Sequence, residues 1–290
     1  MEQFALDAIE HITTRPQENY ETLVADPLTP LLGAEISGLD LSNELTRHQF
    51  TEVKRAFLTH HVLVFRDQTL SAEDHKRFAG RFGRLHPVAP APESSDPYIL
   101  EISATRESRA LAGAGWHADG TADEEPPLGS MLYITRTPEI GSGGDTLFAN
   151  MHLAYEMLSP AMKAFLDDLT AVHDGLLPWD GQTPPAEYVV PKNEHPVVVR
   201  HPDTGRKLLF VNGAHTSHIV QLSRGESRAV LDMLFAHIAR TPILNCRVRW
   251  EPNTLVFWDN RCVQHHEAWD YHPHARHGRQ VAIDGQRPQA

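Results

Sequence analysis

Residues 246–259 read CRVRWEPNTLVFWD, two short runs rich in valine and aromatic residues on either side of Glu251-Pro252-Asn253. Such runs favour strands, and a proline with an asparagine between them favours a turn. The chain holds further runs of this kind: HVLVF (61–65), MLYITR (131–136), PVVVRH (196–201) and KLLFVN (207–212). Many short strands separated by turns predict a mainly β fold, a double-sheet sandwich or jelly roll.

A few helices are expected around these strands. Ser71 and Asp74 resemble a capping box, and Ser159 followed by Pro160 is typical of a helix start. Helical spacing or a cap predicts helices within 45–60, 72–83, 160–169 and 225–239. Because the strands do not alternate regularly with helices, and no GxGxxG follows a strand, a doubly wound α/β fold is disfavoured.

The bulk composition narrows the class of protein. The 290 residues are 41% hydrophobic and 22% charged, and we expect a single domain over residues 1–290. The net charge of -12 argues against nucleic acid or an anionic membrane surface as a partner. The two cysteines form no disulfide framework, and there is neither a secretory signal nor a long apolar run. We therefore expect a cytoplasmic protein.

The stretch GAGWHADGT (113–121) places His117 and Asp119 one residue apart. On a strand, or at the end of one, residues i and i+2 point to the same face, so both side chains could reach one cation. One further histidine would complete a two-histidine, one-carboxylate triad, the arrangement of non-haem Fe(II) oxygenases. Taken alone, a His-x-Asp spacing is weak because it occurs often by chance.

The third ligand is expected within TLVFWDNRCVQHHEAWDYHPHARHGRQVAI (254–283). His265 and His266 are adjacent, so on a strand only one of them can face a cavity. Arg276 lies further along the same segment, and an arginine fork suits the carboxylate of a small dicarboxylic acid. By itself, Arg276 could equally be a surface charge.

Together these pieces resemble the taurine dioxygenase family of Fe(II)/2-oxoglutarate-dependent oxygenases. The resemblance extends from LGAEISGLDLS (32–42) to the C-terminus, nearly the whole chain. Its motifs follow one another in order: WHAD (116–119), PPLGSMLY (126–133), GGDTLF (143–148), HPVVVRHPDTGRKLLFVN (195–212), WDNRCVQH (258–265) and Arg276.

The resemblance implies a double-stranded β-helix, which agrees with the jelly roll predicted above. It implies His117, Asp119 and His265 as ligands of Fe(II), and Thr146 and Arg276 as the anchor of the distal carboxylate of 2-oxoglutarate. Trp258 is expected near this cosubstrate. The implied reaction uses O2 to oxidise a substrate C–H bond and releases succinate and CO2. His266, Cys246 and Cys262 match no ligand position, so we interpret them as structural.

The expected substrate pocket departs from the taurine-oxidising pattern. In the taurine-oxidising pattern an arginine that binds the sulfonate occupies the position of Gln280. Aromatic residues are usual in that pattern at the positions of Ala89 and Ala122. Gly113 replaces an asparagine and His215 replaces a phenylalanine, whereas His86 matches a substrate-contacting histidine. Without its arginine, a sulfonate would lack a charge-assisted partner. We therefore predict a larger small-molecule substrate other than taurine, with hydrogen bonds from His86, His215 and Gln280.

Other interpretations stay open at this point. Arg279 is one residue away from the sulfonate position and could supply charge only if the backbone shifts. The substituted positions could also reflect drift within the family at positions that do not line the pocket. A taurine or alkyl sulfate dioxygenase with an altered pocket is a separate alternative. A jelly-roll binding module without turnover and a zinc hydrolase are alternatives. The resemblance further implies a homo-oligomer.

The segment 175–194, GLLPWDGQTPPAEYVVPKNE, is long, rich in glycine and proline, and without clear periodicity. Loops of this length often cover active sites, so we consider it a candidate lid.

Overall fold

The computed structural model of the protein describes the chain except residues 1, 17, 88–95, 110–112, 114, 139–142, 180, 182 and 187. Its helices are α1 (Gln3–Thr13), α2 (Arg47–His60), α3 (Ala72–Ala79), α4 (Met151–Glu156), α5 (Pro160–Leu166) and α6 (Arg224–Arg240), with short 3-10 turns η1 (Leu177–Trp179) and η2 (Pro242–Leu244). Among the residues that the structure describes, no helix combines the length and the apolar character needed to cross a membrane.

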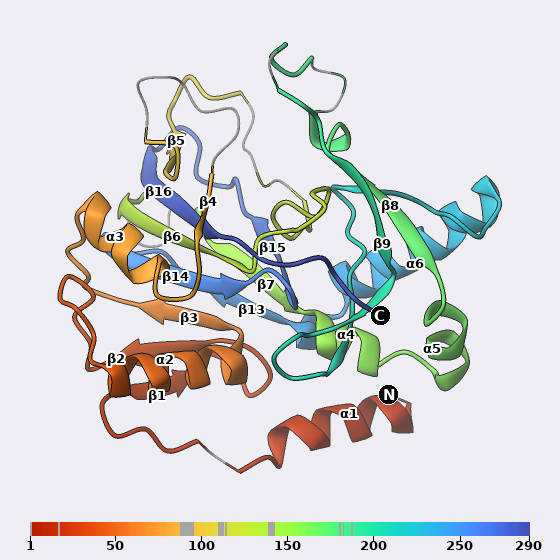
Figure 1. The fold of residues 1–290 in the computed structure, drawn as a ribbon, viewed down its shortest axis with the longest axis horizontal. Coiled ribbons are helices and arrows are strands. Elements are labelled where there is room, and N and C mark those ends of the chain that lie inside the picture. Colours follow the sequence, from red (N-terminus) through yellow and green to blue (C-terminus); the bar gives the residue numbers. More distant parts are fainter. Residues whose placement is uncertain are drawn as a thin grey trace.

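The strands make one large sheet and three small ones (Figure 1). The large sheet runs in the order β1 (Val24–Pro27), β2 (Ala34–Ser37), β3 (Val62–Phe65), β14 (Thr254–Asp259), β6 (Gly129–Arg136), β16 (Arg276–Ile283) and β4 (Leu85–His86), and β5 (Leu100–Ala104) also pairs with β16. The small sheets are β13 (Asn245–Val248), β7 (Thr146–Asn150) and β15 (Val263–Glu267); β12 (Thr216–Ile219), β8 (Thr170–Asp174) and β9 (Lys192–Pro196); and β10 (Val198–Arg200) with β11 (Lys207–Leu209).

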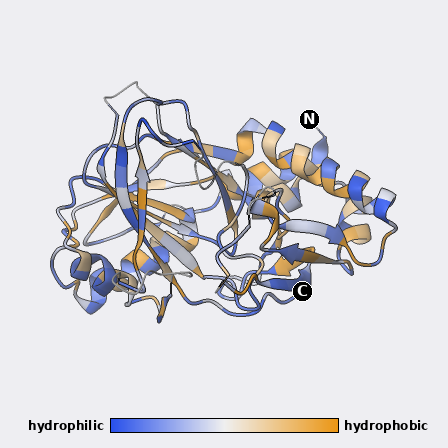
Figure 2. Ribbon diagram, turned by 90° about the horizontal axis from the view of Figure 1, so that it is seen from above, coloured by the Kyte–Doolittle hydropathy of each residue, from blue (hydrophilic) through white to orange (hydrophobic). Residues whose placement is uncertain are grey.

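Alternation along the strands of the large sheet creates two cores. In β3, Val62 and Val64 pack in a core with residues of β7, β13 and β15, whereas Leu63 and Phe65 pack in a core with α2 and α3. In the second core the rings of Phe57 and Phe257 stack with centroids 3.9 Å apart. The face of the large sheet that meets the small sheets is therefore the inside of a jelly roll, and the predicted fold class is confirmed. Figure 2 shows hydrophobic stretches along the inner strands and mixed bands on the helices.

The predicted helices form, and their starts are capped as expected. Ser71 and Asp74 make a reciprocal capping box, and Ser159 accepts a hydrogen bond from the backbone of Met162. The helix that begins at Ala72 ends at Ala79, earlier than predicted. The turn at residues 251–253 joins strands of two different sheets, because β13 pairs with β7 and β14 pairs with β3 and β6. The chain thus crosses between the two layers at this turn.

Candidate metal centre

His117 and His265 lie side by side because their backbones pair. His117 N–H donates to the carbonyl of His265 at 3.0 Å, and His265 N–H donates to the carbonyl of His117 at 2.7 Å. His265 lies on β15, and His117 forms an isolated bridge with it at the entry to the turn that holds Asp119. The HxD pair therefore lies at a strand-like end, as the spacing predicted. The adjacent His266 turns away, with its ring 5.8 Å from that of Trp116.

The three predicted ligand side chains converge. Asp119 Oδ1 lies 3.6 Å from His117 Nε2 and 3.6 Å from His265 Nε2. All three ligand atoms lie within 4.8 Å of one another. His117 Nδ1–H donates to the carbonyl of Gly115 at 2.9 Å, which leaves the lone pair on Nε2 facing the carboxylate. The geometry is that of three donors directed at one point.

The other oxygen of Asp119 is held by two donors. Asp119 Oδ2 accepts from Ser130 Oγ at 2.7 Å and from Gln280 Nε2 at 2.9 Å. Asn260 donates to the same Ser130 hydroxyl at 2.9 Å and accepts from the indole N–H of Trp258 at 2.9 Å. This network fixes the orientation of the carboxylate, so Oδ1 stays directed at the two imidazoles.

Burial and mutual proximity set the protonation states of these side chains. Burial, with the neighbouring His117, lowers the pKa of His265 to about 3. Burial alone would raise the pKa of Asp119, but His265, His117 and Ser130 outweigh it and hold the pKa below its usual value. Burial alone would lower the pKa of His117, but Asp119 outweighs it and raises the pKa. Because a metal ion binds the neutral imidazole beside an ionised carboxylate, binding would compete with a proton on His117.

A buried arginine lies nearby on β16. The Arg276 guanidinium is 1% exposed and donates from Nη1 to Glu267 Oε2 at 3.2 Å. Its Nε and Nη2 have no hydrogen-bond partner among the described residues. The guanidinium also lies over the ring of Trp250, 5.2 Å from its centroid, and Trp250 donates its indole N–H to Thr146 Oγ1 at 3.0 Å. The predicted pair of Thr146 and Arg276 is thus linked through one tryptophan.

Strand register places Arg276 and Thr146 beside the three convergent ligands. His265 and Glu267 are two residues apart on β15 and so share a face, and Glu267 lies opposite Thr146 on β7. Gly113 lies between the two groups with φ 92°: a Cβ there would approach Glu267 Cγ to 3.3 Å and His117 Cε1 to 3.4 Å. The asparagine of the taurine-oxidising pattern would be strained here, because it would need this positive φ and its Cβ would contact both side chains closely.

Glu267 and Trp250 were not singled out from the sequence. Glu267 could have been found, because it follows His265 by two residues and a strand repeats its facing at that interval. Trp250 gave no such signal, since its contact with Arg276 depends on how separate sheets pack.

A cavity of about 330 Å³ opens beside Asp119. Its lining includes His86 and Gln280 from the predicted substrate contacts, together with Asp123 and Tyr188. His86 is not free: its Nδ1 lies 2.9 Å from Asp284 Oδ1, and its Nε2 lies 3.8 Å from Asp123 Oδ2. Gln280 lines the cavity while its amide is committed to Asp119.

The remaining predicted substrate residues are more scattered. The ring of His215 lies 6.4 Å from that of His117, and burial, with His117, lowers its pKa to about 4. Ala122 is buried, and its carbonyl accepts from Asn193 Nδ2 at 2.7 Å. Arg279 donates to the carbonyl of Leu70 and stacks on Tyr133, so its charge does not take the place of the missing arginine. Ala89 lies outside the described residues.

The chain is similar to known proteins over most of its length. The profile of the family "Taurine catabolism dioxygenase TauD, TfdA family" matches residues 25–282. An alkylsulfatase of Acinetobacter baylyi is 34% identical over 95% of this chain and 89% of its own. An alpha-ketoglutarate-dependent 2,4-dichlorophenoxyacetate dioxygenase of Cupriavidus pinatubonensis is 33% identical over 84% and 91%. The solved structure of AAD-2 with Mn(II) and N-oxalylglycine superimposes with a TM-score of 0.79, at 27% identity over 93% of this chain and 100% of that one.

Proposed function

The chain belongs to the taurine catabolism dioxygenase TauD, TfdA family, and we propose that it oxidises a C–H bond of a small organic substrate with 2-oxoglutarate and O2 at an Fe(II) ion. His117, Asp119 and His265 would hold the ion, and Arg276 with Thr146 would hold the distal carboxylate of 2-oxoglutarate. The observation that carries the proposal is the convergence of Asp119 Oδ1 on both Nε2 atoms at 3.6 Å, beside a buried and half-unpaired arginine.

The three side chains fit a metal ion. Two atoms that are each about 2.1 Å from one ion can lie at most about 4.2 Å apart, and the 3.6 Å separations satisfy this limit. Two imidazoles and one carboxylate on one side of the ion leave adjacent positions open, which is the donor set of non-haem Fe(II) oxygenases.

Arg276 and Thr146 together suit one carboxylate of a dicarboxylic acid. Arg276 offers Nε–H and Nη2–H in a buried site, and a carboxylate can accept both at once. Thr146 Oγ1 already accepts from Trp250, so its hydroxyl hydrogen is free to donate to a carboxylate oxygen. The relative crystallised as AAD-2 binds Mn(II) and N-oxalylglycine, by the description of its structure.

When bound, Fe(II) with 2-oxoglutarate supplies the oxidising chemistry: O2 is reduced, 2-oxoglutarate becomes succinate and CO2, and one oxygen atom oxidises the substrate. The chain's residues orient the metal ligands and exclude water from them. Ser130 and Gln280 hold the Asp119 carboxylate, and the indole N–H of Trp258 holds Asn260 in the same network. Trp258 also packs its ring 4.9 Å from that of His265, which keeps water away from that ligand. Hydroxylation is the simplest outcome; desaturation or ring formation would use the same residues.

The cavity beside Asp119 suits a substrate other than taurine. Gln280 presents its amide to Asp119, and Arg279 points elsewhere, so the described lining carries no arginine for a sulfonate. The carboxylates of Asp123 and Asp284 surround His86 instead, which disfavours a small anion there. The alternative, a taurine or alkyl sulfate dioxygenase with an altered pocket, draws support from the named alkylsulfatase relative.

A substrate panel tests this proposal. We expect the Fe(II)-loaded protein to form succinate faster with phenoxyalkanoates than with taurine, because the aromatic part of a larger substrate adds apolar contacts, whereas taurine depends on an arginine for its sulfonate. Faster turnover of alkyl sulfates than of phenoxyalkanoates would favour the alternative. The measurement is succinate release under O2, with each substrate and with none. Strong turnover of taurine would refute the pocket argument and leave the reaction class intact. No succinate with any substrate, and no Fe(II)-dependent binding of 2-oxoglutarate, would favour the binding-module alternative.

Glu267 offers a second test, because its charge faces the arginine that would anchor 2-oxoglutarate. We expect Glu267→Gln to tighten 2-oxoglutarate binding by about tenfold, roughly 1.4 kcal/mol, since the incoming carboxylate no longer meets a like charge. Equilibrium titration with Fe(II) present measures the effect. Glu251→Gln, at an exposed turn position, is the matched control and should change nothing. Equal or weaker binding by Glu267→Gln would show that 2-oxoglutarate does not share Arg276 with Glu267.

We further propose that residues 175–194 act as a lid on a single domain spanning residues 1–290. Tyr188, Val189 and Pro191 line the cavity, and Val189 is largely exposed. The segment's described residues before Lys192 project from the rest of the fold between β8 and β9 (Figure 1), whereas residues 192–194 belong to β9 itself. The cytoplasmic location and the homo-oligomeric state remain predictions.

A further inference from the structure

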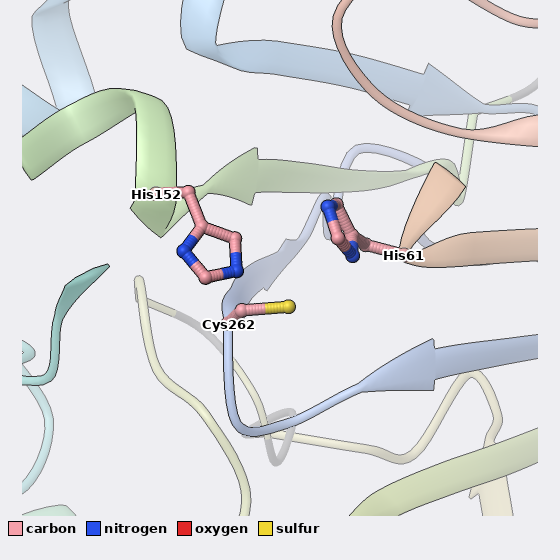
Figure 3. Close-up of side chains that lie close together, drawn as sticks. All are labelled: His61, His152 and Cys262. Carbon is pink, nitrogen blue, oxygen red and sulfur yellow. The ribbon is translucent and has the colours of Figure 1, made fainter. Parts of the chain in front are cut away.

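A second group of metal-binding side chains lies outside the centre described above. His61 follows the last residue of α2, His152 lies in the first turn of α4, and Cys262 lies in the turn between β14 and β15. All three are buried, at 2%, 0% and 0% exposure. Figure 3 shows the Cys262 Sγ directed toward the gap between the two imidazole rings. The ligand atoms of the three residues lie within 4.8 Å of one another.

Both imidazoles have a nitrogen without a partner. His152 Nδ1–H donates to the carbonyl of Lys207 at 2.9 Å, so Nε2 carries the lone pair. His152 Nε2 and His61 Nδ1 are buried and have no hydrogen-bond partner among the described residues. Buried polar atoms are nearly always paired, so two unpaired ring nitrogens beside one thiol call for a ligand.

The backbone holds the three residues in place. Met151 N–H donates to the carbonyl of Cys262 at 3.0 Å, and Asp259 N–H donates to the carbonyl of His61 at 3.0 Å. His61 itself has φ 63°, a left-handed conformation that favours glycine at the end of a helix. A histidine is disfavoured relative to glycine in this conformation. The presence of histidine in this unfavourable conformation is explained if its side chain binds a ligand.

A neighbouring group shares Cys262 but is less suited to an ion. His201 Nδ1 accepts from the backbone N–H groups of Asp203 and Thr204 at 3.2 and 3.3 Å, so its Nε2–H donates to Asp259 Oδ2 at 3.0 Å. His201 thus has no lone pair left for a metal. Asp259 also accepts two hydrogen bonds from Arg261, at 2.8 and 2.7 Å. The hydrogen-bonding groups of His201, Asp259 and Arg261 are therefore already paired with one another.

We propose that His61, His152 and Cys262 form a second metal site, one that binds a borderline-soft divalent transition ion such as Zn²⁺. Two imidazoles and a thiolate are typical zinc ligands, whereas Mg²⁺ and Ca²⁺ prefer oxygen. In a tetrahedral zinc site, nitrogen and sulfur ligands lie about 3.3–3.6 Å apart, so ligand atoms that lie within 4.8 Å of one another must approach by at most about 1.5 Å. Binding releases the thiol proton of Cys262 to solvent.

The charges around His61, His152 and Cys262 are compatible with a bound divalent ion. Arg261 is paired with Asp259 and with Asp203, and Arg206 is paired with Glu156 at 3.0 Å. Both nearby arginines are therefore neutralised by carboxylates, and the ion with one thiolate adds a single positive charge beside Asp259. The site joins three distant segments of the chain, and Cys262 precedes the catalytic-centre ligand His265 by three residues. An ion bound there would stabilise the turn that leads into β15.

Cobalt spectroscopy tests the second site through a thiolate band that does not depend on the proposed function, whereas the ion count rests on both sites. The protein is produced in cells supplied with Co²⁺, so that the ion is present while the buried site folds. A thiolate bound to Co²⁺ gives a near-ultraviolet charge-transfer band, and the trio of His117, Asp119 and His265 contains no sulfur to produce one. We expect this band in the wild type, with two Co²⁺ ions per chain. We also expect Asp119→Ala to lose one ion and keep the band.

The chain has two cysteines, which makes the assignment direct. Cys246→Ser is the matched control, since Cys246 is also buried but lies in a hydrophobic core, and it should keep the band. Cys262→Ser should lose the band and one ion. If Cys262→Ser does not fold, the band in Cys246→Ser still assigns the sulfur ligand to Cys262. A wild-type protein without the band, or a band that disappears in Cys246→Ser, overturns the proposal.

Discussion

The variant His117→Ala is expected to lose the visible charge-transfer band that Fe(II) and 2-oxoglutarate give together under argon. It is also expected to lose activity by more than about 100-fold. Losing a residue that only orients a metal ligand costs up to about 100-fold, and losing the ligand itself should cost more. The reason is geometric: His117 Nε2 lies 3.6 Å from Asp119 Oδ1, and two remaining ligands hold an ion far less tightly than three. Anaerobic titration of the metal-free protein measures the band.

His266→Ala is the matched control for this experiment. His266 is next to His265 in the sequence, but its ring faces Trp116 rather than Asp119. The band and the activity should therefore survive its loss. A band that persists in His117→Ala, or disappears equally in His266→Ala, would mean that the ion binds elsewhere. A wild type without the band would leave the family fold in place and remove the metal centre from the proposal.

Arg276→Leu is expected to weaken 2-oxoglutarate binding by about 30- to 1000-fold, equivalent to roughly 2–4 kcal/mol for a buried charge-assisted contact. The guanidinium is 1% exposed and keeps Nε and Nη2 free of partners among the described residues, so a carboxylate would gain both contacts in a site shielded from water. The effect should appear mainly in the KM for 2-oxoglutarate, with a smaller change in kcat. Arg276→Lys keeps the charge without the planar fork and should be intermediate.

Folding and binding must be separated in this variant. Arg276→Leu leaves Glu267 buried without its partner, which costs about 3–5 kcal/mol of stability. The double variant Arg276→Leu with Glu267→Leu removes both charges, and its stability should recover while its 2-oxoglutarate affinity stays low. If the double variant binds 2-oxoglutarate as the wild type does, Arg276 is a structural ion-pair partner and the anchor lies elsewhere.

The parts of this protein that sequence reasoning could predict are those with local signals. The capped helix starts at Ser71 and Ser159 depend on residues within one turn of each other. The fold class follows from the many short apolar strands. The convergence of His117, Asp119 and His265 was predicted through a family resemblance, because an HxD spacing does not by itself say where the third ligand lies.

The parts that could not be predicted depend on register between distant strands. β7 and β15 carry Thr146, His265 and Glu267, polar residues that point inward, so these strands lack the apolar alternation that marks a half-buried strand. Gln280 was predicted to contact substrate, and its actual contact with Asp119 depends on how β16 lies against β6. His61, His152 and Cys262 come from three separate segments, and no spacing along the chain connects them.

The reciprocal backbone bridge between His117 and His265 has a consequence for synthesis of the protein. These residues are far apart in the chain, so translation produces His117 and Asp119 well before β15, which carries His265. A growing chain on the ribosome therefore holds His117 and Asp119 without their partner until β15 has emerged, and two side chains alone bind a metal ion more weakly than three. Binding of the proposed metal ion would follow the formation of this long-range contact, which is slow compared with local structure. The ion would then stabilise only the folded chain, by mass action on the folded state.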